Sequence, residues 1–261
     1  MVKYIIEICL IVLIGGVPFF VNAQKNIVIN DSLRANADEM KVKMGGQGFG
    51  KTWKFRFGDY GIVSSKQGWT TTSTKANFFN TKTESKTTQK FSFVMAGGTA
   101  DTAFVNAASN IEVKQLQEIE ILNHVFVGNN EVLKESNNFS TFIRINGDTT
   151  SEWVLLMNVI HGTQAEGNYY EAFMTDGVRK IFFVPATSNK NGDDKRSIPA
   201  AGYELVENGA SIAALQYYGG GMLGMNKNII WINRNLDAKM KLILAATLSA
   251  VLQKKMNDMP M

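Results

Sequence analysis

"LDAKMKLILAATLSAVLQKK", residues 236–255 near the end of the chain, is the stretch that decides the fold. Between residues 242 and 252 only one threonine and one serine interrupt the apolar side chains, so a helix here has no polar face. A helix that is apolar all round is enclosed by protein or by lipid. Its apolar part is about 16 Å long, roughly half a bilayer core, and Lys239 and Lys241 block an upstream extension. We therefore expect a buried core helix over 236–255.

The two ends of this segment carry residues that are typical of helix ends. Asn235 is a suitable N-cap, and Asp237 then lies in the first turn, where the positive end of the helix dipole favours an acid. Lys254 and Lys255 lie at the opposite, negative end. These residues predict a helix that begins directly after Asn235.

Most of the remaining chain alternates with the period of a β-strand. "MKVKM" (40–44) and "WKFRF" (53–57) alternate apolar and basic side chains, which predicts one buried and one solvent-exposed face. Asn146-Gly147, Asp176-Gly177 and Asn208-Gly209 separate apolar runs, and such dipeptides accept the positive φ angles of a type I′ hairpin turn. The chain is therefore predicted to be mostly β, a meander of about a dozen short antiparallel strands.

Two polar stretches differ from this pattern. Residues 66–90 are dense in Thr, Ser and Lys, and they form either a long solvated hairpin or a mobile loop. Residues 188–196 are a polar loop, in which Asp193 and Asp194 are predicted to be solvated. The loop lacks the spaced acids and the closing Glu of a calcium-binding loop, and we predict no metal site in it.

A closed sheet would solve two problems of this sequence at once. If the strands form a barrel and the helix fills it, the sheet edges are hidden and the helix is buried on every side. The alternative is a two-layer arrangement, with the helix packed on an open, curved sheet. In either case we expect one mostly β domain over 24–261 that ends in the core helix 236–255.

Three segments at the end of the chain carry a family resemblance. They are the hairpin "GYELVENGASIAALQYY" (202–218), the strand "NIIWIN" (228–233) and the helix 236–252. Together they resemble the tubby-like barrel of tubby, LURP-one-related proteins and phospholipid scramblases, which the rest of the chain matches only in its number of strands. The resemblance implies a barrel around the helix. At the level of the fold alone, it also implies contact with phosphoinositide or membranes through basic surface residues.

The first residues predict export from the cell. Lys3 gives a positive start, an apolar run follows, and small residues precede a cleavage point after Ala23, so residues 1–23 are predicted to be a cleaved signal peptide. The alternative is an uncleaved membrane anchor. The only cysteine, Cys9, lies inside the signal, so the mature chain has no thiol for a disulfide, a metal or catalysis. Export without cysteines indicates a bacterial periplasm or cell surface.

Residues 45–52, which begin at Gly45 and end at Thr52, read "GGQGFGKT" and match the phosphate-loop pattern G-x-x-x-x-G-K-[ST]. A working phosphate loop is followed by a helix whose N-terminus holds the phosphates. Here the alternating segment 53–57 follows instead. We therefore interpret the match as a glycine-rich turn between strands, and we predict no nucleotide and no other cofactor.

Catalytic and nucleic-acid-binding signatures are sparse. The chain has two histidines, His124 and His161, both in strand-like sequence, and we expect each to be a strand residue with satisfied hydrogen bonds. No G-x-S-x-G nucleophile motif occurs. The net charge of +4 is well below the basic density of a nucleic-acid-binding protein. Paired carboxylates leave no sequence signature, so a carboxylate-dependent hydrolase of an envelope polymer remains the alternative function.

The remaining positive signal is a basic face. If the aromatic residues of 53–57 point inward, Lys54 and Arg56 share the outer face near Lys51, and Lys41 and Lys43 can line up beside them. Such a patch suits anionic lipid headgroups or acidic glycans, although a basic outer face also keeps an exposed strand soluble. The expected function is a non-enzymatic binding or structural module of the bacterial envelope.

Overall fold

The computed structural model shows a chain built mostly from β-strands. The residues that it describes are 26–46, 52–77, 82–98, 100–116, 119–122, 125–127, 131–146, 152–163, 169–190, 192, 194, 199–221 and 226–258. Their strands are β1 (Ala37–Lys41), β2 (Lys43–Gly45), β3 (Lys54–Phe57), β4 (Tyr60–Gln67), β5 (Thr71–Ala76), β6 (Lys82–Ala96), β7 (Thr102–Leu116), β8 (Ile119–Leu122), β9 (Val125–Val127), β10 (Glu131–Ile145), β11 (Glu152–His161), β12 (Tyr169–Thr175), β13 (Lys180–Thr187), β14 (Ala201–Glu207), β15 (Ala210–Tyr218) and β16 (Ile229–Asn233). Their helices are α2 (Asp31–Asn36) and α3 (Ala238–Asp258).

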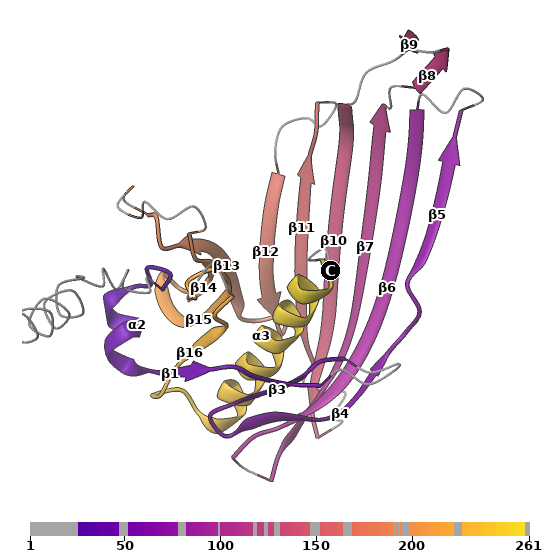
Figure 1. Cartoon of the computed structure of the whole chain (residues 1–261). Helices are drawn as coiled ribbons and strands as arrows, with labels where there is room; N and C mark the ends of the chain where they lie inside the picture. The colour runs from indigo at the N-terminus through magenta and orange to yellow at the C-terminus, as the bar shows by residue number, and fades with distance from the viewer. Residues whose placement is uncertain are drawn as a thin grey trace, which may run out of the picture.

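The strands form one antiparallel sheet that nearly closes into a barrel (Figure 1). Its order is β1-β16-β15-β14-β13-β12-β11-β10-β7-β6-β4-β3-β2; β5 pairs with β6 outside this path, and β8 pairs with β9 separately. The two ends of the order, β1 and β2, are separated in the chain only by Val42, whose N–H donates to the carbonyl of Asn228 at 3.0 Å. The chain itself therefore bridges the ends of the sheet. This confirms the predicted barrel rather than the two-layer alternative.

The C-terminal helix α3 lies inside the curve of the sheet (Figure 1). It contacts β6, β7 and β10 on one side and β15 and β16 on the other, and its side chains are buried at Met240 and from Leu242 to Lys254. The buried core helix is therefore confirmed. Within the described residues, no helix is long and apolar enough to cross a membrane.

The predicted start of the helix was wrong by two residues, because α3 begins at Ala238 and not at Leu236. The N–H of Met240 donates to the Asp237 side chain at 2.8 Å, which makes Asp237 the N-cap. The N–H of Asn235 instead bonds the Asn233 side chain at 2.9 Å, in the turn that follows β16. Asn and Asp are equally good N-caps, and the turn after β16, which holds Asn235, leaves Asp237 directly before the helix.

The N-terminal segment covers the outside of the barrel at β14, β15 and β16. Ile29 and Leu33 pack with Trp231 in a small second core, and the N–H of Ile27 donates to the buried side chain of Gln216 at 2.9 Å. Strands β15 and β16 are therefore buried on both faces. This explains why their sequences are apolar runs without alternation.

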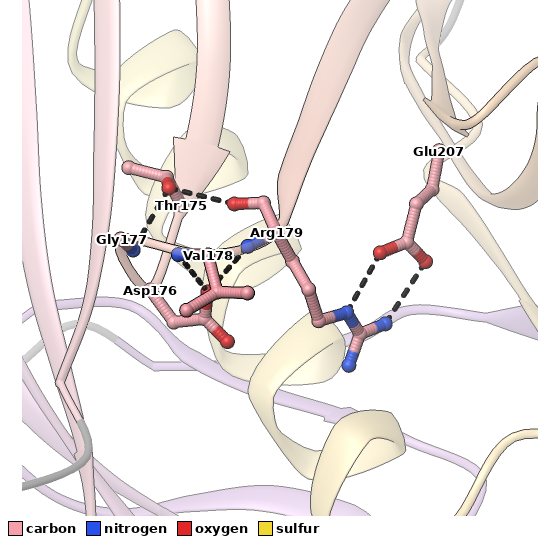
Figure 2. Close-up of polar contacts among 6 residues, drawn as sticks. All are labelled: Thr175, Asp176, Gly177, Val178, Arg179 and Glu207. Atoms are coloured by element: carbon pink, nitrogen blue, oxygen red, sulfur yellow. Dashed lines mark hydrogen bonds and ion pairs between the residues drawn. The ribbon is translucent and has the colours of Figure 1, made fainter.

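The predicted hairpins are confirmed where the turns are described, but the predicted type I′ turn is wrong at Asp176-Gly177: four residues join β12 to β13, and Asp176 has no positive φ angle. Asn208 and Gly209 have φ angles of 50° and 79°, as a type I′ turn requires. In the β12–β13 turn Gly177 has a φ of 92°, and the Asp176 side chain accepts the N–H groups of Val178 and Arg179 at 3.0 and 2.7 Å (Figure 2). The polar stretch 66–90 is a hairpin, because β5 pairs with β6 along its length.

Candidate functional site

Strand β3 carries the basic side chains that the sequence singled out. Phe55 and Phe57 are buried in the barrel core, whereas Lys54 and Arg56 point to solvent, so the predicted alternation is confirmed. In the antiparallel register, Arg56 lies opposite Lys43 of β2. We name Lys43, Lys54 and Arg56 the basic edge.

The other two predicted members lie elsewhere or outside the described residues. Lys41 belongs to β1, where it pairs with Ile229 of β16, so it does not align with β3. Lys51 lies outside the described residues. The sequence could not separate β1 from β2, because the alternation of 40–44 runs unbroken through Val42, the point where the chain changes strand partner.

The charges of the basic edge lack acidic partners among the described residues. Elsewhere on the outer face, Lys86 pairs with Glu112 at 2.7 Å and Lys114 with Glu84 at 3.2 Å. No such ion pair joins Lys43, Lys54 or Arg56 to a described carboxylate. Like charges directly opposite each other destabilise a sheet unless an anion compensates them. The charges of the basic edge therefore suit an anionic partner.

The two ends of the phosphate-loop match lie at the paired strands β2 and β3. Gly45 ends β2 and pairs with Lys54, the first residue of β3, and Thr52 is buried just before it. Residues 47–51 lie outside the described residues. The strand that was predicted after Thr52 is confirmed, so the helix that would hold phosphates at this loop is replaced by β3.

A second polar cluster, which the sequence did not reveal, surrounds the C-terminal end of α3. The ammonium of Lys254 is buried, donates to Asp258 at 2.5 Å and lies 5.8 Å from the centre of the Phe139 ring. Burial lowers the pKa of Lys254, and Asp258 opposes this effect. Beside it, His161 at the end of β11 pairs with Glu135 at 3.2 Å, which agrees with the expectation of a strand histidine with a bonding partner.

Three tyrosines complete this cluster. Tyr203 stacks on Tyr170 at 6.3 Å between ring centres and contacts Tyr217 at 5.4 Å, and the Lys255 ammonium lies 4.9 Å from the Tyr217 ring. Burial is the largest cause that raises the pKa of each tyrosine, to about 12 for Tyr217. At neutral pH these phenols are therefore protonated hydrogen-bonding groups. They come from β12, β14 and β15, which are distant in sequence, so no spacing pattern could have grouped them.

The polar loop after β13 is better anchored than predicted. Asp194 is buried rather than solvated, and the Ser188 hydroxyl donates to its carboxylate. The Ser188 oxygen in turn accepts the N–H of Ala200 at 2.8 Å, so these bonds tie the loop to the start of β14. Asp193, like His124, lies outside the described residues. The described residues contain no group of three His, Cys, Asp or Glu side chains placed to hold a metal ion.

Comparisons with known proteins were made at three levels. None of them gave a match: no protein-family description, no curated protein and no solved structure is similar to the chain. The tubby-like resemblance of 202–252 therefore stays a prediction. Function has to be argued from the residues of the fold itself.

Proposed function

We propose that the mature chain, 24–261, is an exported, non-enzymatic binding module of a bacterial envelope, and that its basic edge meets an anionic surface of lipid headgroups or acidic glycans. The observation that carries this proposal is the outward pairing of Lys43 with Arg56, next to Lys54, without a described acidic partner. Each basic side chain near an anionic membrane contributes about 1 kcal/mol. Three such side chains predict weak binding, and salt should weaken it further because it screens their charges.

The described fold is compatible with removal of a signal peptide after Ala23. Its first described residues are Asn26 and Ile27, whose contacts with Lys227 and Gln216 attach the N-terminal segment to the barrel. A chain that begins at Gln24 keeps all of these contacts. Such a chain is the right material for the binding experiment.

The edge strands favour a surface role over catalysis. The basic edge belongs to β2 and β3, and β2 is a terminal strand of the sheet order. Glu135 and Asp258, the acids of the helix-end cluster, each face a basic group, His161 and Lys254. No observation on the described residues favours the hydrolase alternative, which stays a prediction.

Flotation with liposomes tests the proposal. The chain 24–261 is mixed with phosphatidylcholine vesicles, or with vesicles that also contain phosphatidylglycerol, at low and at moderate salt. An immobilised acidic polysaccharide provides the parallel glycan arm. We expect binding in at least one anionic arm, weaker at moderate salt because the exposed charges are screened.

Two double variants with the same loss of charge distinguish a site from a general charge effect. Lys54→Gln with Arg56→Gln should reduce binding, whereas Lys75→Gln with Lys82→Gln, on the exposed β5–β6 hairpin, should not. Equal reduction by both pairs, or no binding in either anionic arm, contradicts the proposal. The basic residues would then serve to keep an edge strand soluble.

A further inference from the structure

The outer face of the sheet is hollowed across β4, β6, β7 and β10. One hollow of about 360 Å³ is lined mainly by Lys66, Lys90, Ser92, Asn106, Ser140 and Phe142. A second hollow of about 180 Å³ adjoins it and shares Lys66, Ser92 and Asn106. We name the two together the outer groove. The larger hollow alone reaches the size range of small-molecule sites.

The register explains why a groove forms on this face. Lys66, Ser92, Asn106 and Phe142 lie side by side on four neighbouring strands. The next row above them is Lys90, Ala108 and Ser140. In the first row, Ser92 and Asn106 lie between the longer side chains of Lys66 and Phe142. In the second row, Ala108 and Ser140 are small, and Lys90 stands on the same side as Lys66. The floor is therefore low between the basic rim, Lys66 and Lys90, and the aromatic rim, Phe142. The strands of Lys66 and Phe142 are about 14 Å apart at the usual strand spacing.

The basic rim has two lysines in reach of one anionic group. Lys66 lies opposite Ser92, two residues from Lys90 on the same face, so the two lysines are diagonal neighbours. Neither has an ion pair with a described carboxylate, and no acid lines the groove. Further along the outer face, on β6 and β7, Lys86 and Lys114 are each compensated by a glutamate. The charge of the groove is therefore complementary to an anion.

The rest of the lining indicates the chemistry of the occupant. Ser92, Asn106 and Ser140 offer hydroxyl and amide groups, and the Phe142 ring, 44% exposed, offers a flat apolar face. Trp69, 85% exposed, directly follows Gly68, which also lines the groove. An open groove cannot enclose an acyl chain, but it suits a sugar ring, which has an apolar C–H face and hydroxyl groups around its rim. Apolar ring faces pack on aromatic side chains, and carboxylates form charge-assisted bonds with lysine.

We propose that the outer groove binds a short oligosaccharide of uronic acids, with a carboxylate between Lys66 and Lys90 and a sugar ring against Phe142. This site is separate from the basic edge, because the groove lies on β4 to β10 and the edge on β2 and β3. The proposal goes beyond the surface contact of the basic edge. Either site can fail its test without the other.

Calorimetric titration of the chain 24–261 with trigalacturonic acid is the direct test. The methyl ester of the same trimer is the matched ligand, since it keeps the rings and hydroxyl groups and loses the charge. We expect the acid to bind and the ester to bind about tenfold more weakly, as the loss of charge-assisted contacts predicts. Moderate salt should weaken binding of the acid and leave the ester unchanged.

Three variants locate the site. Lys66→Gln with Lys90→Gln should weaken trigalacturonate binding about tenfold, and Phe142→Ala should weaken it several-fold through the lost ring contact. Lys75→Gln with Lys82→Gln removes the same charge on the β5–β6 hairpin, outside both proposed sites, and should leave the affinity unchanged. Unfolding curves establish that each variant is folded.

Three results would overturn the proposal. The ester could bind as tightly as the acid, or the Lys66 and Lys90 variant could bind as tightly as the unaltered chain. Alternatively, the trimer could fail to bind while anionic vesicles bind in a manner that needs Lys66 and Lys90. That last result would assign the groove to lipid headgroups instead.

Discussion

The side chain of Gln253 accepts a hydrogen bond from the backbone N–H of Trp53 at 3.0 Å. Gln253 is completely buried near the end of α3, and its amide also donates to Asn257 at 2.9 Å. Trp53 directly precedes β3, which carries Lys54 and Arg56. The core helix therefore fixes the backbone where the basic edge begins, and the interior of the barrel is coupled to its proposed binding surface.

Gln253→Met tests this link. Methionine has a similar shape but only a weak acceptor, so the part-buried N–H of Trp53 loses its partner, at a cost of about 1–3 kcal/mol in the free energy of unfolding. Urea denaturation of the chain 24–261 measures the loss. Gln89→Met is the control, since Gln89 accepts from Asn257 at a half-buried position where water can replace the bond. Equal losses in the two variants would contradict the coupling.

Leu244→Asp tests the enclosure of the helix. Leu244 is fully buried within the barrel, and a carboxylate there cannot reach water, so the variant should fail to fold. Ala238→Asp introduces the same residue at the exposed first position of α3, where the helix dipole favours an acid, and should fold normally. Soluble expression and a cooperative thermal transition are the measurements. A cooperatively melting Leu244→Asp variant would mean that the helix is not enclosed.

The fold could be predicted because its main determinants are local. The apolar stretch 242–252 required burial on all sides, and the alternation of 53–57 indicated which face of β3 is exposed to solvent. Antiparallel strands with short turns then left the barrel as the economical closure. The cap at Asp237 could not be assigned with the same certainty. Asn235 and Asp237 are both good caps, and only the path of the chain after β16 chooses between them.

The candidate sites depend on register, which composition does not reveal. Lys54 and Arg56 were found because they are neighbours in the sequence, whereas the pairing of Lys43 with Arg56 needs the β2–β3 alignment. The outer groove joins Lys66 and Phe142 through three strand pairings. A shift of one residue in any of them would move a side chain to the opposite face. The groove could therefore not be derived from spacing.

Glu207→Gln tests the anchor of the β12–β13 turn. Arg179 donates to both carboxylate oxygens of Glu207, at 2.7 and 2.9 Å (Figure 2). Its guanidinium also lies 5.3 Å from the centre of the Trp153 ring. Glutamine is neutral and has only one oxygen acceptor, so it cannot accept both hydrogen bonds of Arg179. We therefore expect a loss of about 1 kcal/mol in the free energy of unfolding. Denaturant titration at low and high salt gives the value.

Glu112→Gln is the matched control for this ion pair. Glu112 pairs with Lys86 at 2.7 Å, but both side chains are about half exposed, so the change should stay within about 0.5 kcal/mol. If the two glutamate variants lose the same stability, the two-pronged geometry at Arg179 adds nothing. A larger loss at Glu207 that persists in high salt would agree with the half-buried position of that pair.

Alkaline pH should destabilise the barrel through its tyrosines. Burial raises the pKa of Tyr170, Tyr203 and Tyr217 above the ordinary value of 10.0, to about 12 for Tyr217. The folded chain therefore holds these protons more tightly than the unfolded chain. Their stabilising contribution is complete below pH 10 and is lost as the pH rises toward about 12, at roughly 1.4 kcal/mol per pH unit for Tyr203 or Tyr217 where that tyrosine titrates only in the unfolded state. Tyr170, 38% exposed, contributes less because water screens it.

The sign of this effect separates the tyrosines from their neighbour Lys254. Burial lowers the pKa of Lys254 below 10.5, so its contribution acts in the opposite direction, rising with pH until that value is passed. Above pH 10.5 only the tyrosines of this cluster still change the free energy of unfolding with pH. Urea unfolding between pH 9 and 12 should therefore show stability falling most steeply in the upper part of that range. Tyr217→Phe should reduce the slope. The difference in tyrosinate absorbance between the unaltered chain and this variant should appear together with unfolding, because exposed Tyr218 is common to both chains and cancels. A difference that rises near pH 10 while the chain stays folded would show that the Tyr217 phenol is open to water.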